Sequence, residues 1–187
     1  KVSIVPFTLK RQLNIKIFII NFKSLLLQMS FTEDKESDNY ATDKKGWEII
    51  EPYIPKDKII WSPFYCDGKQ KEHFEEMGYN IIHEDKDFFS YTPEYDIIVD
   101  NPPFSKWNDI CNKLKELNKP FILIMFPRIF LTKGFQKVFK DHLQLIIPNK
   151  RPTFTHLTNG KKGYTPPMGT WYFCYKMNLE KDLIFLD

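Results

Sequence analysis

The sequence is short of cysteine and of glycine. Its three cysteines, Cys66, Cys111 and Cys174, are odd in number and include no Cys-x-x-Cys pair, which argues against a disulfide framework and against a structural zinc site. Seven glycines beside 16% aromatic residues exclude collagen-like and low-complexity chains, and this aromatic content is too high for a disordered chain. We therefore expect one folded domain in a reducing compartment, cytoplasmic or nuclear, and no secretion.

Long hydrophobic runs are also missing. The apolar stretch at residues 13–27 is interrupted by Lys16 and Lys23 and is too short to span a bilayer. It also lacks the uninterrupted apolar segment and the small-residue cleavage site of a signal peptide. The sequence therefore predicts no membrane anchor and no membrane partner.

Residues 1–28 differ in charge from the rest of the chain. They carry five cations and no acid, whereas a polar run follows Met29. We expect 1–28 to be a basic apolar extension outside the core, with natural translation starting at Met29; the alternative is an amphipathic arm that touches membrane or nucleic acid. A disordered amino terminus is expected over 29–41 and a single domain over 42–187.

Acidic and basic residues separate along that domain. From Phe31 to Asp100 there are 18 acidic and 8 basic residues, whereas from Lys119 to Lys176 there are 10 basic residues and one acid. Such a division is expected when one half holds a small cofactor and the other meets a polyanion, the alternative being an ordinary solvated surface. The charge pattern thus favours a nucleic acid as the partner.

Short apolar runs alternate with segments of helical periodicity. Strands are expected at 58–62, 79–83, 95–100, 120–126, 143–147 and 169–176, and helices at 42–53, 69–77, 108–117 and 130–139. Strands that are apolar on both faces and alternate with helices predict a doubly wound α/β fold with a mostly parallel sheet. The last two strands lack a helix between them and are expected to form an antiparallel hairpin at the sheet edge.

The most specific motif is Asn101-Pro102-Pro103-Phe104, which follows a buried strand and Asp100. Two consecutive prolines fix both φ angles and offer no N–H, so the carbonyls there need other donors. An exocyclic amine held between the Asn101 side-chain oxygen and the Pro102 carbonyl would supply them, while Phe104 stacks on the base. Two acceptors would also aim the nitrogen lone pair at an electrophilic methyl group. The alternative is a plain turn that leaves a strand.

With this motif the chain resembles the amino-methyltransferases that use S-adenosylmethionine, and is most similar to the N6-adenine methyltransferases. The resemblance extends from Thr42 to Lys176. It implies a class I, Rossmann-like methyltransferase fold with a seven-stranded sheet, S-adenosylmethionine as the cofactor, and Asn101, Pro102, Pro103 and Phe104 as catalytic residues. Asn101 also counts among the cofactor-binding residues.

The same family has a cofactor loop after its first strand, and residues 61–68 resemble that loop. Pro63, Phe64, Asp67 and Gly68 carry the similarity, whereas Ser62 stands in place of the usual acid and Cys66 in place of the first glycine.

Further cofactor contacts are implied on either side of that loop. Glu84 or Asp85 is placed to bind the ribose hydroxyls, as in dinucleotide folds. Asp87 and Phe88 resemble the pair that receives the cofactor's adenine. Thr42 and Lys45 resemble the element that covers the methionine carboxylate.

Other catalytic signatures are absent from the sequence. It has no phosphate-binding loop, no Gly-x-Ser-x-Gly elbow and no His-Glu-x-x-His pair. The four histidines are scattered along the chain, so no metal is implied.

The substrate is assigned to the long loop over 148–167. Its cations suit backbone phosphates and its aromatic side chains suit an unstacked base; the residues concerned are Lys150, Arg151, Phe154, Lys161, Lys162 and Tyr164. A base must leave the duplex stack before it can be methylated. Little chain remains for a recognition domain, so specificity is expected to be short, shape-based, or supplied by a partner protein or a second copy.

The sequence leaves the substrate and the activity open between alternatives. DNA is the expected substrate, but the same tetrapeptide occurs in RNA adenine and guanine methyltransferases. A protein methyltransferase uses Asn-Pro-Pro-Tyr, although the basic half argues against a protein substrate. The departures at Ser62 and Cys66 are also compatible with a catalytically degenerate fold that binds nucleic acid.

Overall fold

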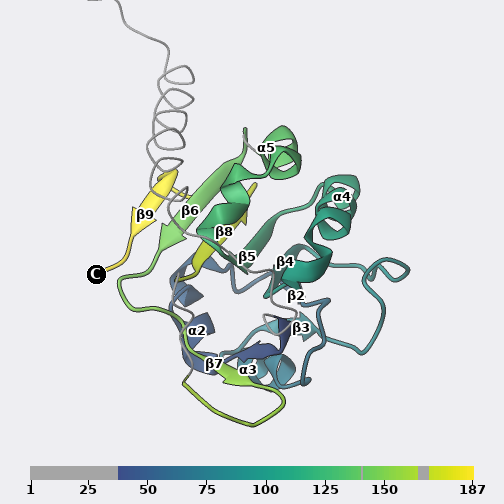
Figure 1. The fold of residues 1–187 in the computed structure, drawn as a ribbon, viewed down its shortest axis with the longest axis vertical. Coiled ribbons are helices and arrows are strands. Elements are labelled where there is room, and N and C mark those ends of the chain that lie inside the picture. Colours follow the sequence, from purple (N-terminus) through teal and green to yellow (C-terminus); the bar gives the residue numbers. More distant parts are fainter. Residues whose placement is uncertain (1–37, 140, 164–168) are drawn as a thin grey trace, which may run out of the picture.

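The computed structural model describes residues 38–139, 141–163 and 169–187 of the chain (Figure 1). The expectations for residues 1–28 and 29–37, and for Tyr164, lie outside this described part. Of the terminus expected to be disordered up to residue 41, Tyr40 and Ala41 instead belong to a strand, so that boundary was wrong.

The main sheet has seven strands in the order β3-β2-β4-β5-β8-β6-β9. In chain order these are β2 (Ile59–Trp61), β3 (Asn80–Ile82), β4 (Ile97–Asp100), β5 (Phe121–Met125), β6 (Leu143–Ile147), β8 (Trp171–Tyr175) and β9 (Leu183–Phe185). All neighbouring pairs are parallel except the two that involve β8. The predicted mostly parallel seven-stranded α/β sheet is therefore confirmed.

The position of the antiparallel strand was predicted wrongly. β8 pairs with β6 as expected, but its other edge pairs with β5, with Met125 opposite Trp171. It therefore lies inside the sheet, as suits a strand whose residues 172–175 are all buried. β9, which the apolar pattern did not reveal, adds in parallel to β6 and takes the edge position.

Helices cover both faces of this sheet (Figure 1). The helices are α2 (Lys44–Glu48), α3 (Gln70–Glu76), α4 (Trp107–Leu117) and α5 (Lys133–Phe139), with short 3-10 turns at η2 (Glu51–Tyr53), η3 (Phe104–Lys106) and η4 (Pro127–Leu131). The first expected helix, 42–53, is shorter because Thr42 pairs in a strand and the chain leaves the α conformation at Ile50, where φ is −105° and ψ is 4°. No helix in the described ranges is long and apolar enough to cross a membrane.

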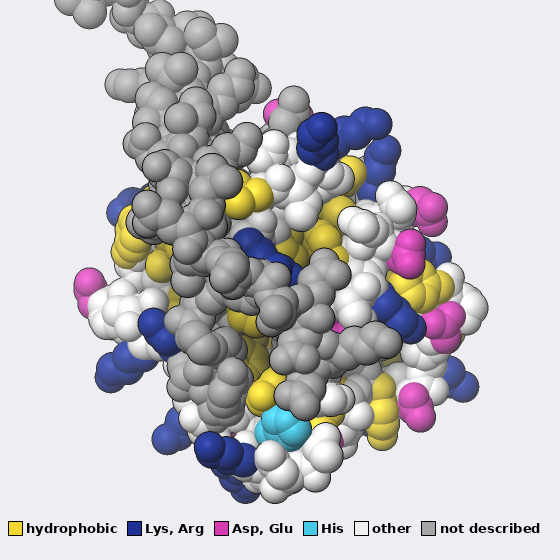
Figure 2. All heavy atoms as spheres, in the orientation of Figure 1, with side chains coloured by type: hydrophobic (Ala, Val, Ile, Leu, Met, Phe, Trp, Pro, Cys, Tyr) yellow, Lys and Arg dark blue, Asp and Glu magenta, His cyan; other side chains and the backbone are white. Residues whose placement is uncertain are grey.

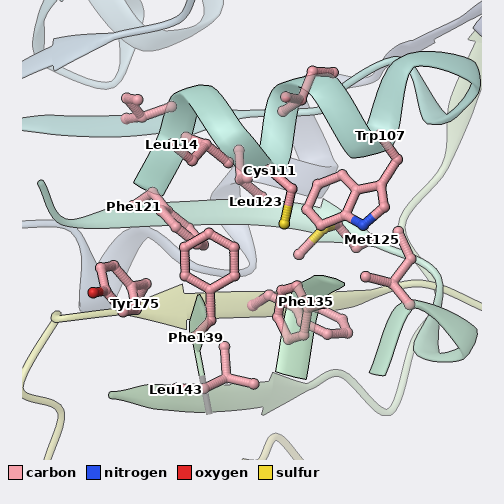
Figure 3. Close-up of a cluster of buried hydrophobic side chains, with 14 of the residues drawn as sticks. Trp107, Cys111, Leu114, Phe121, Leu123, Met125, Phe135, Phe139, Leu143 and Tyr175 are labelled. Atoms are coloured by element: carbon pink, nitrogen blue, oxygen red, sulfur yellow. The ribbon is translucent and has the colours of Figure 1, made fainter. Parts of the chain in front are cut away.

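Two hydrophobic clusters fill the two faces. Alternate residues of β5 divide between them: Phe121, Leu123 and Met125 join the cluster under α4 and α5, and Ile122 and Ile124 join the cluster under α2 and α3. Figure 3 shows the first cluster, in which side chains of α4 and α5 point at the strands. Because β5 is buried on both faces, the position of its carboxyl end is fixed, and its parallel neighbour β4 ends at the same edge of the sheet.

A separate two-stranded sheet joins distant segments. β1 (Tyr40–Thr42) pairs antiparallel with β7 (Phe154–His156), with Tyr40 opposite His156 and Thr42 opposite Phe154. Asp43 extends the contact, since its N–H donates to the Thr153 carbonyl at 3.1 Å and its carboxylate accepts from the Thr155 hydroxyl at 2.6 Å. The start of the described chain is thereby fixed to the long loop after β6.

Candidate active site

Asp100, the last residue of β4, ties two loops together. Its side chain is 1% exposed and accepts hydrogen bonds from the Ser62 hydroxyl at 3.0 Å and from the N–H groups of Phe64 and Asn101 at 2.7 Å each. Burial raises the pKa of Asp100 to about 7, because desolvation of the carboxylate outweighs these three donors. The loop after β2 and the motif after β4 therefore share one buried acid.

Asn101 is held with its amide in a defined orientation. Its Nδ2 donates to the Tyr40 carbonyl at 3.4 Å, while its Oδ1 is buried and has no hydrogen-bond partner among the described residues. A buried acceptor without a donor is costly, and such atoms in folded proteins point to a ligand, a water or stored strain. Oδ1 is the atom that the sequence pattern assigned to an incoming amine.

The carbonyls of the two prolines come directly after Asn101 in the chain. The Pro103 carbonyl accepts from the Lys106 N–H at 3.4 Å and so serves the turn that follows. Pro102 is buried, and its carbonyl directly follows Asn101 in the chain. The structure thus brings the Asn101 side chain and the Pro102 backbone to the carboxyl end of β4 as predicted.

Phe104 is half-buried, and its ring lies against Phe126, which follows β5, with centroids 4.5 Å apart. Its N–H donates to Asp38 Oδ1 at 2.7 Å, and the Ser105 N–H donates to the same oxygen at 3.3 Å. Asp38 was not singled out from the sequence, because it lies in the segment expected to be disordered. The only signal available was its side-chain type, since Asp is a common helix-capping residue.

The loop after β2 is packed against itself. Cys66 and Gly68 both adopt positive φ angles, 52° and 77°, and a Cβ at Gly68 would lie 2.8 Å from the Tyr65 hydroxyl. The Tyr65 ring also stacks on His83, with centroids 5.0 Å apart and an interplanar angle of 25°. Positive φ is costly for a residue with a side chain, so Cys66 occupies a conformation that glycine would adopt more easily.

His83 is a residue of this region that the sequence did not reveal. It follows β3, is 5% exposed, and its Nδ1 lies 2.8 Å from the Ser62 carbonyl. Its Nε2 is buried without a partner in the described residues, and desolvation lowers the pKa of the ring. A neutral ring with Nδ1 donating to the carbonyl leaves Nε2 as an acceptor.

The acids after β3 are at the surface. Glu84, Asp85 and Asp87 are all exposed; Asp87 Oδ2 accepts from the Ser90 N–H at 3.0 Å, and Glu84 accepts from the Tyr91 hydroxyl, which raises the pKa of Tyr91. These acids thus remain accessible, although two of them already have local partners.

Phe88 does not offer the free face that was expected for a purine. It is 4% exposed and packs against Phe64 and Trp61, with centroids 5.0 and 5.5 Å apart. Stacking on a ligand needs an accessible ring face, so we withdraw this assignment: in the structure Phe88 is a core residue.

Of the remaining expected cofactor residues, Pro63 is buried, and Asp67 closes a local turn by accepting from the Lys69 N–H at 3.2 Å. Thr42 is 7% exposed, and its hydroxyl oxygen is buried without a partner in the described residues. Lys45 is exposed.

Four of the expected substrate residues are exposed around β7: Lys150, Arg151, Lys161 and Lys162. Figure 2 shows Lys and Arg side chains along the lower edge of this face, where Figure 1 places β7 and the loop that follows it. Lys161 and Lys162 follow a tight turn, which is closed by the His156 N–H donating to the Lys161 carbonyl at 2.9 Å.

The structure contradicts the assignment of Phe154 as a residue that contacts the bases of the substrate. It is 3% exposed and belongs to the cluster under α2 and α3, so it cannot wedge against a base. Residues 154–156 form a strand with β1, in which Phe154 is buried and Thr155 and His156 are partly buried.

No cluster of three or more His, Cys, Asp or Glu side chains that could hold a metal is found in the described ranges.

Comparison with known proteins gives structural likenesses alone. The sequence matches no protein-family model, and no curated protein matches it. Among solved structures, a candidate RNA methyltransferase from Pyrococcus horikoshii is similar with a TM-score of 0.46 and 9% identity, over 92% of this chain and 98% of that one.

Two further methyltransferases are similar in the same way. A precorrin-6y C5,15-methyltransferase from Geobacter metallireducens has a TM-score of 0.41 and 11% identity, over 75% of this chain and 97% of that one. An S-adenosylmethionine-dependent methyltransferase from Thermotoga maritima has a TM-score of 0.34 and 12% identity, over 88% of this chain and 99% of that one. At these scores and identities, the function proposed for this chain has to rest on its own residues.

Proposed function

We propose that this chain is an S-adenosylmethionine-dependent methyltransferase that transfers a methyl group to the exocyclic N6 amine of adenine in nucleic acid. The observation that carries the proposal is the Asn101 side chain: its Oδ1 is buried and has no partner in the described residues, while its Nδ2 is already engaged with the Tyr40 carbonyl. An acceptor oriented in this way fits an amine that donates to it.

The chemistry follows from the acceptors of the motif. An adenine amine carries two N–H groups, which Asn101 Oδ1 and the Pro102 carbonyl would receive. Two such bonds hold the nitrogen closer to tetrahedral geometry and free its lone pair from the ring. Phe104, braced by Phe126, would support the base. Preorganised acceptors of this kind act without reorganising during the reaction.

The cofactor expected beside this motif is S-adenosylmethionine, which supplies the electrophilic methyl group. Unpaired buried atoms support a polar ligand at the carboxyl ends of the strands, because three such atoms belong to Thr42, His83 and Asn101. A fourth belongs to Thr170, which precedes β8 beside the end of β5. The other buried side-chain atoms without a hydrogen-bond partner in the described residues belong to Trp47, His73, Tyr95 and Trp107.

The residues that would hold the cofactor lie at the ends of β2 and β3. Asp67 and Gly68 belong to the loop after β2, and the exposed carboxylates of Glu84, Asp85 and Asp87 follow β3. His83 Nε2 adds an acceptor that the sequence alone did not indicate.

The nucleic-acid part of the proposal rests on the position of β7. This strand pairs with β1, whose Tyr40 carbonyl contacts Asn101, so the loop cations on either side of β7 are connected to the motif through two hydrogen-bonded strands. Lys150, Arg151, Lys161 and Lys162 are exposed and would neutralise backbone phosphates. DNA is the proposed substrate, with RNA as the alternative.

The test is methyl transfer from labelled S-adenosylmethionine to single-stranded and duplex DNA and RNA of matched sequence. Digestion and mass spectrometry should then find the label in N6-methyladenine. Label in another nucleoside would change the substrate, and no transfer to any of the nucleic acids, with cofactor shown to bind, would reject the activity.

A second candidate function is a catalytically degenerate fold that binds nucleic acid, and the loop after β2 favours it. The Tyr65 ring covers Gly68 and stacks on His83, and so occupies the region to which the cofactor was assigned. Calorimetry with S-adenosylmethionine separates the two functions: the degenerate fold predicts no binding by the native chain and a gain of binding in Tyr65→Ala, whereas the enzyme predicts that the native chain binds.

A further inference from the structure

One short segment holds the Asn101–Phe104 motif at both ends. At the first end, the Tyr40 carbonyl accepts from Asn101 Nδ2. At the second end, the Asp38 carboxylate accepts from the N–H groups of Phe104 and Ser105 at 2.7 and 3.3 Å. Both contacts come from residues more than sixty positions earlier in the chain.

The motif needs an acceptor from elsewhere because its own residues cannot provide one. The chain turns directly into η3 and α4, and the first N–H groups of a helix require partners outside it. The residue at the N-cap position of η3 is Pro103, whose side chain makes no capping hydrogen bond. A carboxylate is the stronger kind of acceptor for such N–H groups, and Asp38 supplies it across space.

This cap also fixes the backbone on which the amine would dock. The Phe104 N–H belongs to the peptide that begins at Pro103, and the Pro102 carbonyl belongs to the peptide just before it. Pro103 joins these two peptides with φ of −66°, which its ring locks, and ψ of 122°, which remains soft. Holding the Phe104 N–H therefore restricts the one soft backbone torsion between that N–H and the Pro102 carbonyl.

We propose that Asp38 is a positioning residue for methyl transfer: its carboxylate sets the Pro102 carbonyl relative to the Asn101 side chain, so that both acceptors meet one amine. This inference rests on the proposed function. A purely structural cap would stabilise α4 without affecting the reaction, so the two roles differ in which measured quantity changes.

Kinetics on the full chain separate these roles. Asp38→Ala should lower kcat by about 10- to 100-fold, because displacement of reacting groups by an ångström or less has effects of this size. The affinity for S-adenosylmethionine should stay within about twofold, since the hydrogen bonds of the Asp38 carboxylate in the described residues come from the N–H groups of Phe104 and Ser105. Asp38→Asn keeps an acceptor oxygen and should restore kcat to within about fivefold of the native value.

The matched control is Asp109→Ala. Asp109 is exposed and lies in the first turn of α4, so its removal changes the charge at the same helix start without touching the motif. We expect native kcat for this variant. Equal kcat for the native chain and Asp38→Ala, or equal losses in Asp38→Ala and Asp109→Ala, would overturn the positioning role.

An NMR measurement keeps this test independent of the activity. Asp38→Ala should move the amide resonances of Phe104 and Ser105 and those of the Asn101 side-chain NH2, whereas Asp109→Ala should leave the Asn101 resonances in place. If the native chain transfers no methyl group but these shifts occur, the proposed function fails and the coupling of Asp38 to Asn101 stands. Unchanged Asn101 resonances in Asp38→Ala would reject that coupling.

Discussion

The loops after β4 and β2 follow two neighbouring parallel strands, yet they are stabilised by different contacts. The loop after β4 is rigid through Pro102 and Pro103 and is held by Asp38 and Tyr40 from outside, while Asn101 Oδ1 is buried and unpaired in the described residues. The loop after β2 is closed on itself, with Tyr65 folded over Gly68.

The difference separates the two halves of the proposed reaction. On the amine side, the acceptor is already oriented before any ligand arrives. On the cofactor side, a ring lies where the ligand was expected, so Tyr65 must either move or become part of the binding surface. Asp100 is common to both loops, because its carboxylate accepts hydrogen bonds from each of them.

The largest expected effect on activity is that of removing the Asn101 side-chain acceptor. Asn101→Ala should lower methyl transfer by roughly a thousandfold, comparable to the loss of a preorganised hydrogen-bonding group in other active sites. Calorimetry should show nearly unchanged cofactor binding. Asn112→Ala, which removes an exposed amide from α4, is the matched control and should retain full activity. A large loss of cofactor affinity with native turnover at saturation would place Asn101 on the cofactor instead.

Removing the Asp100 carboxylate, which links the two loops, should change how the free energy of unfolding depends on pH. The native pKa of Asp100 is about 7, above its unfolded value near 3.9, so the folded chain binds more protons between these values and the free energy of unfolding falls as pH rises from about 4 to 7. Asp100→Asn should remove this decline, which amounts to roughly 2–4 kcal/mol.

Denaturant unfolding at pH 5 and pH 8 measures this decline for both chains. The same pH dependence in the native chain and in Asp100→Asn would show that Asp100 titrates at its ordinary value.

Replacing one surface acid tests where the cofactor binds. Asp87→Asn keeps an oxygen for the Ser90 N–H but removes the charge, and should weaken S-adenosylmethionine binding by about tenfold or more. Asp57→Asn is the control, because Asp57 is exposed and precedes the amino end of β2. An unchanged dissociation constant for Asp87→Asn would move the adenosine away from this turn.

The smallest effect concerns the cations near β7. Replacing Lys161 and Lys162 together with Ala should reduce the slope of log affinity against log salt by up to about two units and weaken different sequences nearly equally. The control replaces Lys115 and Lys181, which are exposed on α4 and before β9. Titration of a labelled oligonucleotide at several salt concentrations gives the slopes. If the first pair leaves the slope unchanged, the loop lies outside the nucleic-acid site.

The parts of the fold that the sequence predicted are those with local causes. β5 and the first three residues of β4 are continuous apolar runs, and the motif follows β4 because two prolines end a strand. These signals need no knowledge of distant partners. The position of Asn101 at a strand end was therefore predictable.

The parts that were missed depend on pairing between distant residues. Phe154 looked like a loop aromatic, and its burial follows from pairing with Thr42. Asp38 capping Phe104 is another contact across the chain, and β9 becomes an edge strand only because β6 lies beside it. Side-chain type and the spacing of apolar residues along the sequence carry no information about such distant partners.

The insertion of β8 between β5 and β6 also determines the order in which the sheet can be completed. β5 and β6 precede β8 in the chain, and each pairs with it rather than with the other. During synthesis, β6 therefore has no neighbour in the sheet until residues 171–175 have left the ribosome. Contacts between segments so far apart in sequence form slowly because loop closure comes first. Until β8 has been synthesised, β5 therefore has an open edge on the side away from β4.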